Sequence, residues 1–485
     1  MGEKQGTLFS PEYNRSIQVE ARAEKLTSDA GALLVREVME RLGYSELIAR
    51  HLTDPRVPGR VRHSQVELVR TALLLLAQGW SGQSDVGLLR ADPAFRAAVS
   101  SRRGQRPLRA AAGREPEGLC SQPTLSRLHQ DLGRQQNRTG LRRMLLEGAQ
   151  RRMRPQGPRL RETTLDLDSV PYEVHGHQPG SARNRYYGMR CYHPLLVRSE
   201  QGDYLDAKLR PGNVHTAEGG LQFVLPILQR ARTWAEQVWL RMDAGFPEST
   251  LLDQLEEEGF RYVARLNGNA VLKRMAEPYL TQPPAEGQVR THELIYRAAK
   301  WTRPRRVVLV VLERTREQGE LFLEHFFLLT NVSVAEVPAE QLLERYRQRG
   351  TAEKDFGEWK QALDVSLSSS PRPKEHYRGC EVEAPYAKPD SFAANEARLL
   401  LSLIAANLMH AATALLERGE AARPSRERFR QLVLKTAARV VLSGRRIAFV
   451  IESSRAALWR HCVRELNRLY PPRGSPVPQA LPTPA

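Results

Sequence analysis

Cysteine is scarce in this chain of 485 residues, which contains only four. They are widely scattered and form no C-x-x-C pair: Cys120, Cys191, Cys380 and Cys462. Neither a disulfide framework nor a cysteine-ligated zinc site is predicted, and the distribution is typical of a reducing cytoplasm. The first residues, MGEKQGTLFSPEYN, also lack the apolar core of a signal peptide.

Long uninterrupted apolar runs are absent as well. The longest apolar stretch, residues 399–416, is interrupted by Ser402, Asn407 and His410, which favours a buried helix over a membrane span. The chain contains no phosphate-binding glycine loop and no nucleophile elbow. We therefore expect a cytoplasmic protein that is not built around a nucleotide or a catalytic serine.

Acidic residues are too few to balance the basic ones. Lys and Arg total 73 against 55 Asp and Glu, which gives a net charge of +18. Residues 101–160 alone contain fourteen arginines and four acids. Such a charge predicts a polyanionic partner, most simply DNA, although a GC-rich genome would also enrich arginine. The short basic helix predicted in SQPTLSRLHQDLG is compatible with a helix-turn-helix.

The pattern of apolar residues changes along the chain and divides it into five segments. Residues 1–155 are predicted to form a helical, basic DNA-binding region. Residues 156–270 alternate between strands and helices, as in a mixed α/β core. Residues 271–335 contain three strand-like runs and are predicted to be a β-rich insertion. Residues 336–465 would complete the core with helices, and 466–485 would be a disordered tail.

Within the predicted core, TTLDLDSV, YYGMRCYHPLLVRS and DYLDAKLRPG indicate three successive strands. Helices and strands then alternate up to residue 267. Residues 366–390 are proline-rich and polar, which predicts an exposed loop. The segments 391–417 and 425–465 are both predicted to be helical.

Carboxylates are the residues most suited to chemistry. Asp166 and Asp168 lie on the same face of the predicted strand TTLDLDSV, opposite its leucines. Asp243 ends the apolar strand of WLRMDAGF, and Glu353 lies on a later helix. A carboxylate buried in a strand needs a partner or a metal. Three such groups suit two Mg²⁺ ions acting on a phosphodiester, although each acid taken alone is more often structural.

The helix around Glu353 carries an unusual stripe of polar residues. In YRQRGTAEKDFGEWK, Tyr346, Arg349, Glu353 and Lys360 fall within about 60° of arc on one continuous helix. A solvated helix with ordinary ion pairs would explain this spacing. If Glu353 is a metal ligand, the same face should instead present Tyr346, Arg349 and Lys360 to DNA phosphates.

The spacing Tyr346-x2-Arg349-x3-Glu353-x6-Lys360 resembles the signature around the last acid of DDE transposases of the insertion-sequence 4 superfamily. Further stretches resemble, in order, the blocks of the insertion-sequence 1380 family within it, over roughly residues 60–450. These stretches are GWSGQSDVGLLRADPAF, LDLDSVPYEVHGHQPG, YYGMRCYHPLLV, LRPGN, RMDAGF, SFAANEARLLLSLIAANL and LKTAARVVLSGRRI. The segment 366–390 is longer than the family pattern.

The resemblance implies a ribonuclease-H-like core, with the β-rich insertion between the second Asp and the Glu. It assigns Asp168, followed by a small hydroxyl residue, as the first catalytic acid and metal ligand, with Asp166 as a competitor. Asp243 and Glu353 would be the second and third. It further implies two Mg²⁺ ions, replaceable by Mn²⁺, and cut-and-paste transposition between terminal inverted repeats and target DNA. A homodimer on DNA and a hairpin intermediate are also expected.

Two other sets of residues and two other functions stay open. His175 and His177 suit a loop or a DNA contact better than a metal site. Trp301 would be either a core residue or a platform for an extruded base. A nuclease with the same core would cut without joining, and a domesticated DNA-binding protein would do neither.

Overall fold

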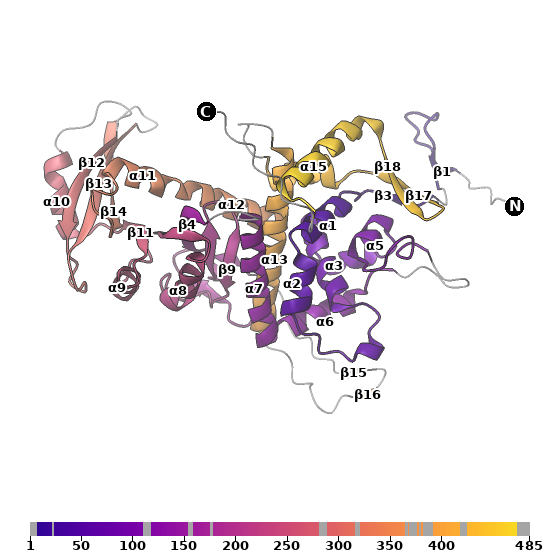
Figure 1. The fold of residues 1–485 in the computed structure, drawn as a ribbon, viewed down its shortest axis with the longest axis horizontal. Helices are drawn as coiled ribbons and strands as arrows, with labels where there is room; N and C mark the ends of the chain where they lie inside the picture. Colours follow the sequence, from indigo (N-terminus) through magenta and orange to yellow (C-terminus); the bar gives the residue numbers. More distant parts are fainter. Residues whose placement is uncertain are drawn as a thin grey trace.

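A computed structural model describes most of the chain. That part comprises residues 7–21, 24–109, 118–153, 159–174, 178–280, 289–315, 321–363, 367, 376–377, 380–381, 391–417 and 424–472. The elements fall into a sheet with its covering helices and a helical region beside it (Figure 1). The long helix α13 (Ser391–Thr413) stands between the two.

An eight-stranded mixed sheet forms the first part, in the order β12-β13-β14-β11-β10-β4-β8-β9. Its strands are β4 (Leu160–Ser169), β8 (Leu195–Ser199), β9 (Tyr204–Lys208), β10 (Ala235–Met242), β11 (Arg261–Leu266), β12 (Val289–Tyr296), β13 (Arg305–Thr315) and β14 (Leu321–Thr330). Only the β4–β10 and β10–β11 pairs are parallel. Each segment predicted to be a strand between residues 163 and 330 contains strand structure, and the strands of the 271–335 segment continue the same sheet beyond β11.

Helices cover both faces of this sheet because the strands alternate in the direction of their apolar side chains. On one face, Leu165 and Leu167 of β4 and Leu240 of β10 pack in a core with three helices, one that precedes β10 and two that follow β10 and β11. These helices are α8 (Gly220–Ala231), α9 (Ser249–Glu257) and α10 (Ala270–Leu280). On the other face, α11 (Ala339–Arg347) packs on Trp239 and Val263. Asp166 and Asp168 point to this second face, away from the leucines, as predicted.

The polar stripe predicted on one helix lies on two. Helix α11 ends at Arg347, and α12 (Arg349–Leu363) begins after Gln348. The guanidinium of Arg241 donates a hydrogen bond of 2.5 Å from Nη1 to the carbonyl oxygen of Arg345. In a continuous helix that oxygen accepts the N–H of residue 349. The prediction of one continuous helix was therefore wrong, because Tyr346 belongs to α11 and Arg349 starts α12.

The helical region combines segments from both ends of the chain. Its N-terminal helices are α1 (Ala32–Arg41), α2 (Tyr44–His51), α3 (Gln65–Gln78), α4 (Asp85–Leu88), α5 (Pro93–Val99), α6 (Gln122–Leu132) and α7 (Gln135–Met153). They share one hydrophobic core with α13, α12 and α15 (Ala456–Leu469). Helix α13, with the short turn that follows it, is long and apolar enough to cross a membrane, but its most apolar window is 89% buried inside the fold. The prediction of a buried helix is confirmed.

The prediction of a helix throughout 425–465 was wrong. After α14 (Arg426–Phe429) and a short π-helical turn, a hairpin forms from β17 (Ala438–Ser443) and β18 (Arg446–Ile451). More buried and exposed residues alternate along both strands. Gly444, with a φ of +55°, supplies the left-handed conformation that a two-residue hairpin turn needs. β17 also pairs with β3 (Leu26–Thr27) near the start of the chain. Helix α15 continues to Leu469, past the predicted start of the tail.

A small second sheet lies beside the end of β4. It is formed by β5 (Tyr172–Glu173), β6 (Ala182–Asn184) and β7 (Met189–Tyr192), in the order β5-β7-β6. The single strand predicted over 186–199 is therefore two strands, β7 and β8, in different sheets. Pro194 lies between them, and its lack of an N–H prevents continuous pairing across the junction.

Candidate active site

Two of the predicted acids lie at the ends of adjacent parallel strands. Leu167 of β4 is in register with Met242 of β10, so the next residues, Asp168 and Asp243, emerge side by side. Each carboxylate accepts a hydrogen bond at Oδ1 from the following backbone N–H, at 2.8 Å from Ser169 and 2.7 Å from Ala244. The carboxyl ends of the two strands therefore hold both side chains in a defined orientation.

The second oxygens of these carboxylates face one guanidinium. Nη2 of Arg349 lies 2.7 Å from Oδ2 of Asp168 and 4.0 Å from Oδ2 of Asp243. Arg349 and Asp168 are both nearly buried, whereas 47% of the Asp243 side chain is exposed. The guanidinium thus supplies positive charge where two carboxylate oxygens converge. Oxygen donors placed in this way also fit a hard divalent cation.

Burial dominates the protonation of Asp168. It raises the pKa of this carboxyl to about 6, although the charge of Arg349 and the Ser169 N–H act in the opposite direction. The negative charges of Asp243 and Asp166 raise the pKa further. Asp168 is therefore ionised at neutral pH but takes up a proton in mildly acidic solution.

Asp166, the competitor for the first position, has a different environment. It is 1% exposed and is held by both branches of the Arg241 guanidinium, at 2.5 Å from Nε and 2.9 Å from Nη2. Nη1 of Arg198 lies 3.9 Å from Asp166 Oδ2. This carboxylate has strong protein partners, and its contacts join β4 to β10 and, through Arg241, to α11.

Helix α12 brings the third predicted acid to this end of the sheet. Glu353 lies one turn after Arg349 on the same side of α12, but its side chain is outside the described part. The helix is fixed by the buried side chains of Phe356 and Trp359. It is also fixed by an ion pair between Asp355 and Arg198 of β8. The side chains that the structure describes contain no group of three His, Cys, Asp or Glu that could hold a metal ion.

The remaining residues predicted to contact DNA have protein contacts in this structure. Nζ of Lys360 donates a hydrogen bond of 2.6 Å to the carbonyl oxygen of Pro171, just beyond β4. Burial lowers the pKa of Lys360 below its usual range. Tyr346 is partly buried and packs against the hydrophobic cluster under α11. The three residues thus do not form one outward-facing stripe.

The structure gives an outcome for Trp301 but not for the two histidines. His175 and His177 lie outside the described residues. Trp301 is 5% exposed, with its ring 5.5 Å from that of Tyr296 and under the guanidinium of Arg305, at 5.0 Å. It is a core residue, as one of the two interpretations predicted.

The sequence reasoning missed Arg241, Asp355 and Arg198. A charged residue inside an apolar strand, as in WLRMD and LLVRS, was the signal that could have found the two arginines.

Residues 9–377 match the family described as transposase DDE domain group 1. No curated protein matches the chain.

Proposed function

The chain belongs to the family of transposase DDE domain group 1, and on that premise we propose that it moves a DNA element by cut-and-paste transposition. In this proposal it binds the terminal inverted repeats of an insertion sequence, cuts the DNA there, and joins the freed ends to target DNA. The convergence of Asp168 Oδ2 and Asp243 Oδ2 on one cationic group carries the proposal. We further propose that the element belongs to the insertion-sequence 1380 family, on the ordered sequence blocks.

The strand order supports a ribonuclease-H-like core. The five strands β9-β8-β4-β10-β11 are neighbours in this order, with the first three antiparallel and the last three parallel. Strands β14, β13 and β12 extend the sheet beyond β11 and lie in sequence between Asp243 and Glu353. An insertion at that point is what the resemblance to the insertion-sequence 4 superfamily implies.

Asp168 and Asp243, together with Glu353, would hold two Mg²⁺ ions or Mn²⁺ in their place. When bound, such cations activate the attacking oxygen and stabilise charge on the leaving oxygen. The N–H groups of Ser169 and Ala244 hold the Oδ1 atoms, which leaves both Oδ2 atoms directed at the shared position. Asp166 keeps its arginine partner and supports the strands instead of the cations.

Two displacements at phosphorus account for the reaction. In the first, a water oxygen bonds to the scissile phosphorus and the 3′ oxygen leaves as a hydroxyl. In the second, this 3′ oxygen bonds to a phosphorus of the target, and the target's own 3′ oxygen leaves. One P–O bond forms for each that breaks, and no covalent protein–DNA intermediate is needed. A hairpin at the element end would follow from the same displacement within one duplex.

DNA phosphates would replace protein groups as the partners of several basic side chains. When a phosphate enters, the Arg349 guanidinium can leave Asp168 and bind two phosphate oxygens in parallel. Lys360 would act as a point charge beside the same strand end. Tyr346 would bind a DNA phosphate through its hydroxyl from α11, whereas Arg349 and Lys360 would do so from α12. These exchanges couple the arrival of DNA to the release of the carboxylates.

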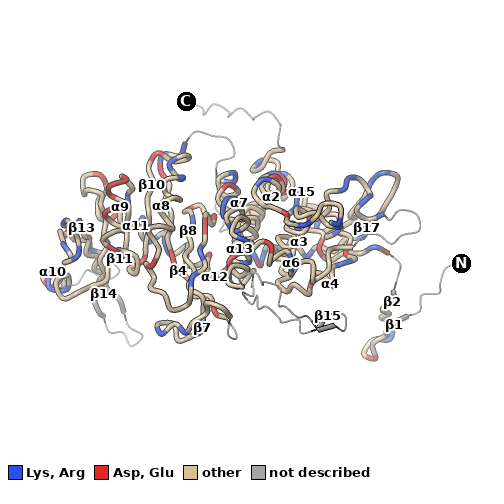
Figure 2. Tube along the Cα trace, turned by 90° about the horizontal axis from the view of Figure 1, so that it is seen from below, with Lys and Arg blue, Asp and Glu red and all other residues tan. Residues whose placement is uncertain are grey.

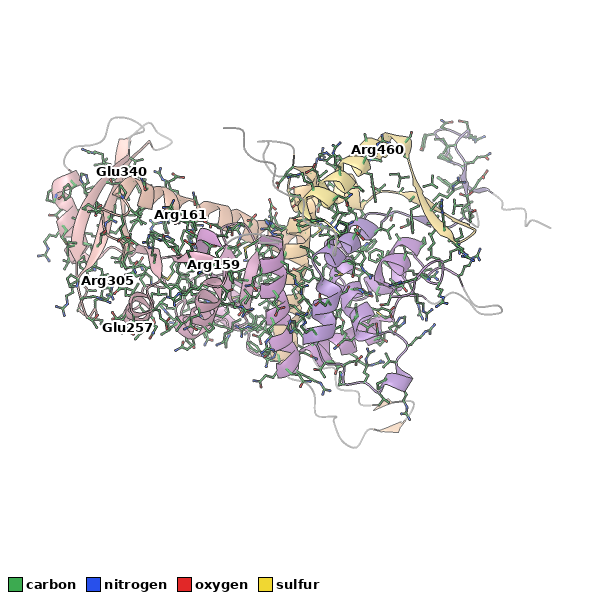
Figure 3. All side chains as sticks on the ribbon, viewed as in Figure 1. Arg159, Arg161, Glu257, Arg305, Glu340 and Arg460 are labelled. Atoms are coloured by element: carbon green, nitrogen blue, oxygen red, sulfur yellow. The ribbon has the colours of Figure 1, made fainter. Side chains whose placement is uncertain are left out.

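The helical region is proposed to bind the inverted repeats, but fewer of its arginines are available than the sequence suggests. Three arginines of α7 form ion pairs with acids elsewhere: Arg138 with Glu396, Arg142 with Asp206, and Arg152 with Asp203. Arg159 donates to the carbonyl oxygens of Arg232 and Ala235 (Figure 3). Arg127 and Arg143 are exposed and remain the better candidates for phosphate contacts.

The test is incubation of the full chain with DNA carrying both ends of the element, a target plasmid and Mg²⁺. Cleavage at the ends followed by joining supports the proposal, and a homodimer should assemble on the paired ends. Asp168→Ala, Asp243→Ala and Glu353→Ala should each abolish cleavage but keep end binding, whereas Glu344→Ala, an exposed acid on α11, should not. Full cleavage by Asp168→Ala would transfer its role to Asp166. Cleavage without joining would indicate a nuclease. The absence of both cleavage and joining would overturn the proposal.

A further inference from the structure

The turn between β6 and β7 is built rigidly around one buried asparagine. Oδ1 of Asn184 accepts the backbone N–H groups of Tyr186 and Tyr187, at 3.0 Å and 3.3 Å, and its Nδ2 donates to the carbonyl oxygen of Gly212 at 2.8 Å. Gly188 closes the turn with a φ of +68° and a hydrogen bond of 2.9 Å from its N–H to the carbonyl oxygen of Asn184. The turn therefore holds a fixed shape at the surface.

The sheet beneath this turn is anchored to the core. The hydroxyl of Tyr192, on β7, accepts a hydrogen bond of 3.1 Å from Asn395 of α13. The Tyr192 ring also lies edge-on to Phe392, at 5.6 Å. Because the sheet is anchored in this way, the turn would lose little conformational entropy on binding a ligand.

The turn presents an aromatic ring to solvent. Tyr186 is 89% exposed, an unusual position for a large ring on a structured turn. Its neighbour Tyr187 meets it edge to face at 4.9 Å and in turn contacts His193 at 5.7 Å. Tyr187 thus packs against Tyr186, and most of the Tyr186 ring surface is left to the solvent.

Positive charge flanks the ring. Arg183 and Arg185 are exposed on either side of Asn184, and Lys and Arg positions gather around β7 in Figure 2. An exposed aromatic between cations is the combination with which proteins bind single-stranded nucleic acid: the ring stacks on a base and the cations contact phosphates.

The turn also lies near the candidate active site. β7 pairs with β5, which begins three residues after Ser169, so the small sheet extends directly from the end of β4. Burial raises the pKa of Tyr187 above its ordinary value, and the charges of Tyr186, Asp168 and Asp243 contribute in the same direction. The two catalytic candidates are therefore within electrostatic range of this turn.

We propose that Tyr186 is a stacking platform for an unpaired DNA base next to the cleaved phosphate, with Arg183 and Arg185 on the neighbouring phosphates. The proposal rests on the proposed function, because it places the base on the strand that the carboxylates would cut. Strand separation at an element end would expose such a base. The turn would then hold the end of that strand during the two displacements.

The experiment measures DNA binding by the full chain in Ca²⁺, so that affinity is read without turnover. The probes are a blunt duplex and the same duplex with a single-stranded thymidine overhang. Binding of each probe is measured by fluorescence anisotropy. The wild type should prefer the overhang. Tyr186→Ala should weaken overhang binding by about 5- to 150-fold, the range expected for one stacked base, and leave blunt-duplex binding unchanged. Tyr186→Phe, which keeps the ring, should bind as the wild type does.

Two controls separate stacking from other effects. Tyr13, also highly exposed at 85%, provides the matched variant Tyr13→Ala, which should keep the overhang preference. Arg185→Ala should weaken both probes and reduce the salt slope by about 1, as expected for one lost phosphate contact. The inference is overturned if Tyr186→Ala binds the overhang as the wild type does or if the wild type shows no preference. It is equally overturned if the variant changes only the oligomeric state. Absence of cleavage by the wild type in Mg²⁺ would contradict the proposed function alone.

Discussion

Replacing Arg349 with alanine should strengthen the binding of divalent cations in the absence of DNA, although it should impair cleavage. Nη2 of Arg349 lies 2.7 Å from Oδ2 of Asp168, in an ion pair that is nearly buried. A cation that uses this oxygen must first displace the guanidinium. The wild type therefore loses a charge-assisted hydrogen bond on binding the cation, whereas the alanine variant has no such bond to lose.

The size of the effect follows from that bond. A hydrogen bond to a charged group contributes about 1.5–3 kcal/mol, which corresponds to roughly 10- to 150-fold in affinity. A second effect opposes it: without Arg349 the pKa of Asp168, already about 6, rises further, and protons compete with the cation. Titrating at a pH about two units above that value keeps the carboxylate ionised and exposes the gain.

Calorimetric titration of the full chain with Mn²⁺ measures the change. Arg347→Ala is the matched control, since Arg347 is exposed two residues earlier and its loss alters the net charge equally. Arg349→Lys should fall between the wild type and Arg349→Ala, because an ammonium keeps the charge but not the planar fork. Equal affinity of the wild type and Arg349→Ala, or an equal gain in Arg347→Ala, would refute the reasoning.

Three further predictions concern stability and DNA binding. The pKa of Asp168 is raised in the folded state, so the contribution of this carboxyl group to stability falls as pH rises through about 4 to 6. Asparagine carries no charge at any of these pH values. Asp168→Asn should therefore raise the free energy of unfolding near neutral pH by up to about 3 kcal/mol. That gain should vanish near pH ~4 in urea titrations. Arg241→Met should destabilise the fold by about 3–5 kcal/mol, because it leaves Asp166 buried without its main partner; a denaturation midpoint equal to that of the wild type would contradict this. Arg127→Ala and Arg143→Ala should each reduce the salt slope of DNA binding by about 1, whereas Arg142→Ala should lower thermal stability through its ion pair with Asp206.

The sequence predicts the sheet well because its strands obey local rules. In TTLDLDSV the leucines alternate with Asp166 and Asp168, and this alternation determines which face each side chain occupies. The pattern did not show that the strand of Asp168 and the strand that ends before Asp243 are parallel neighbours, so the expected closeness of the two acids rested on the resemblance. The roles of these acids stay a prediction.

What the sequence did not predict depends on contacts between distant residues. The break between α11 and α12 arises where Arg241, a hundred residues earlier, binds the carbonyl oxygen of Arg345. The surplus of arginine in 101–160 overstates the free charge, because acids such as Asp203 and Asp206 neutralise part of it from another element. The hairpin at 438–451 had its local signal, an alternating pattern around Gly444, but basic residues between the apolar ones were equally compatible with an amphipathic helix.

The position of α13 has a consequence for synthesis of the chain. The N-terminal helices pack around residues 391–413, and the strand at 26–27 pairs with residues 438–439. The contact of Arg138 with Glu396 spans 258 positions and that of Thr27 with Ala438 spans 411, so the first helices must wait on the ribosome for their partner to emerge. A product ending before α13 would expose the apolar sides of α3 and α7 and become a substrate for proteases. Premature termination or frameshifting should therefore remove the protein and should not release a stable fragment that competes for the element's ends.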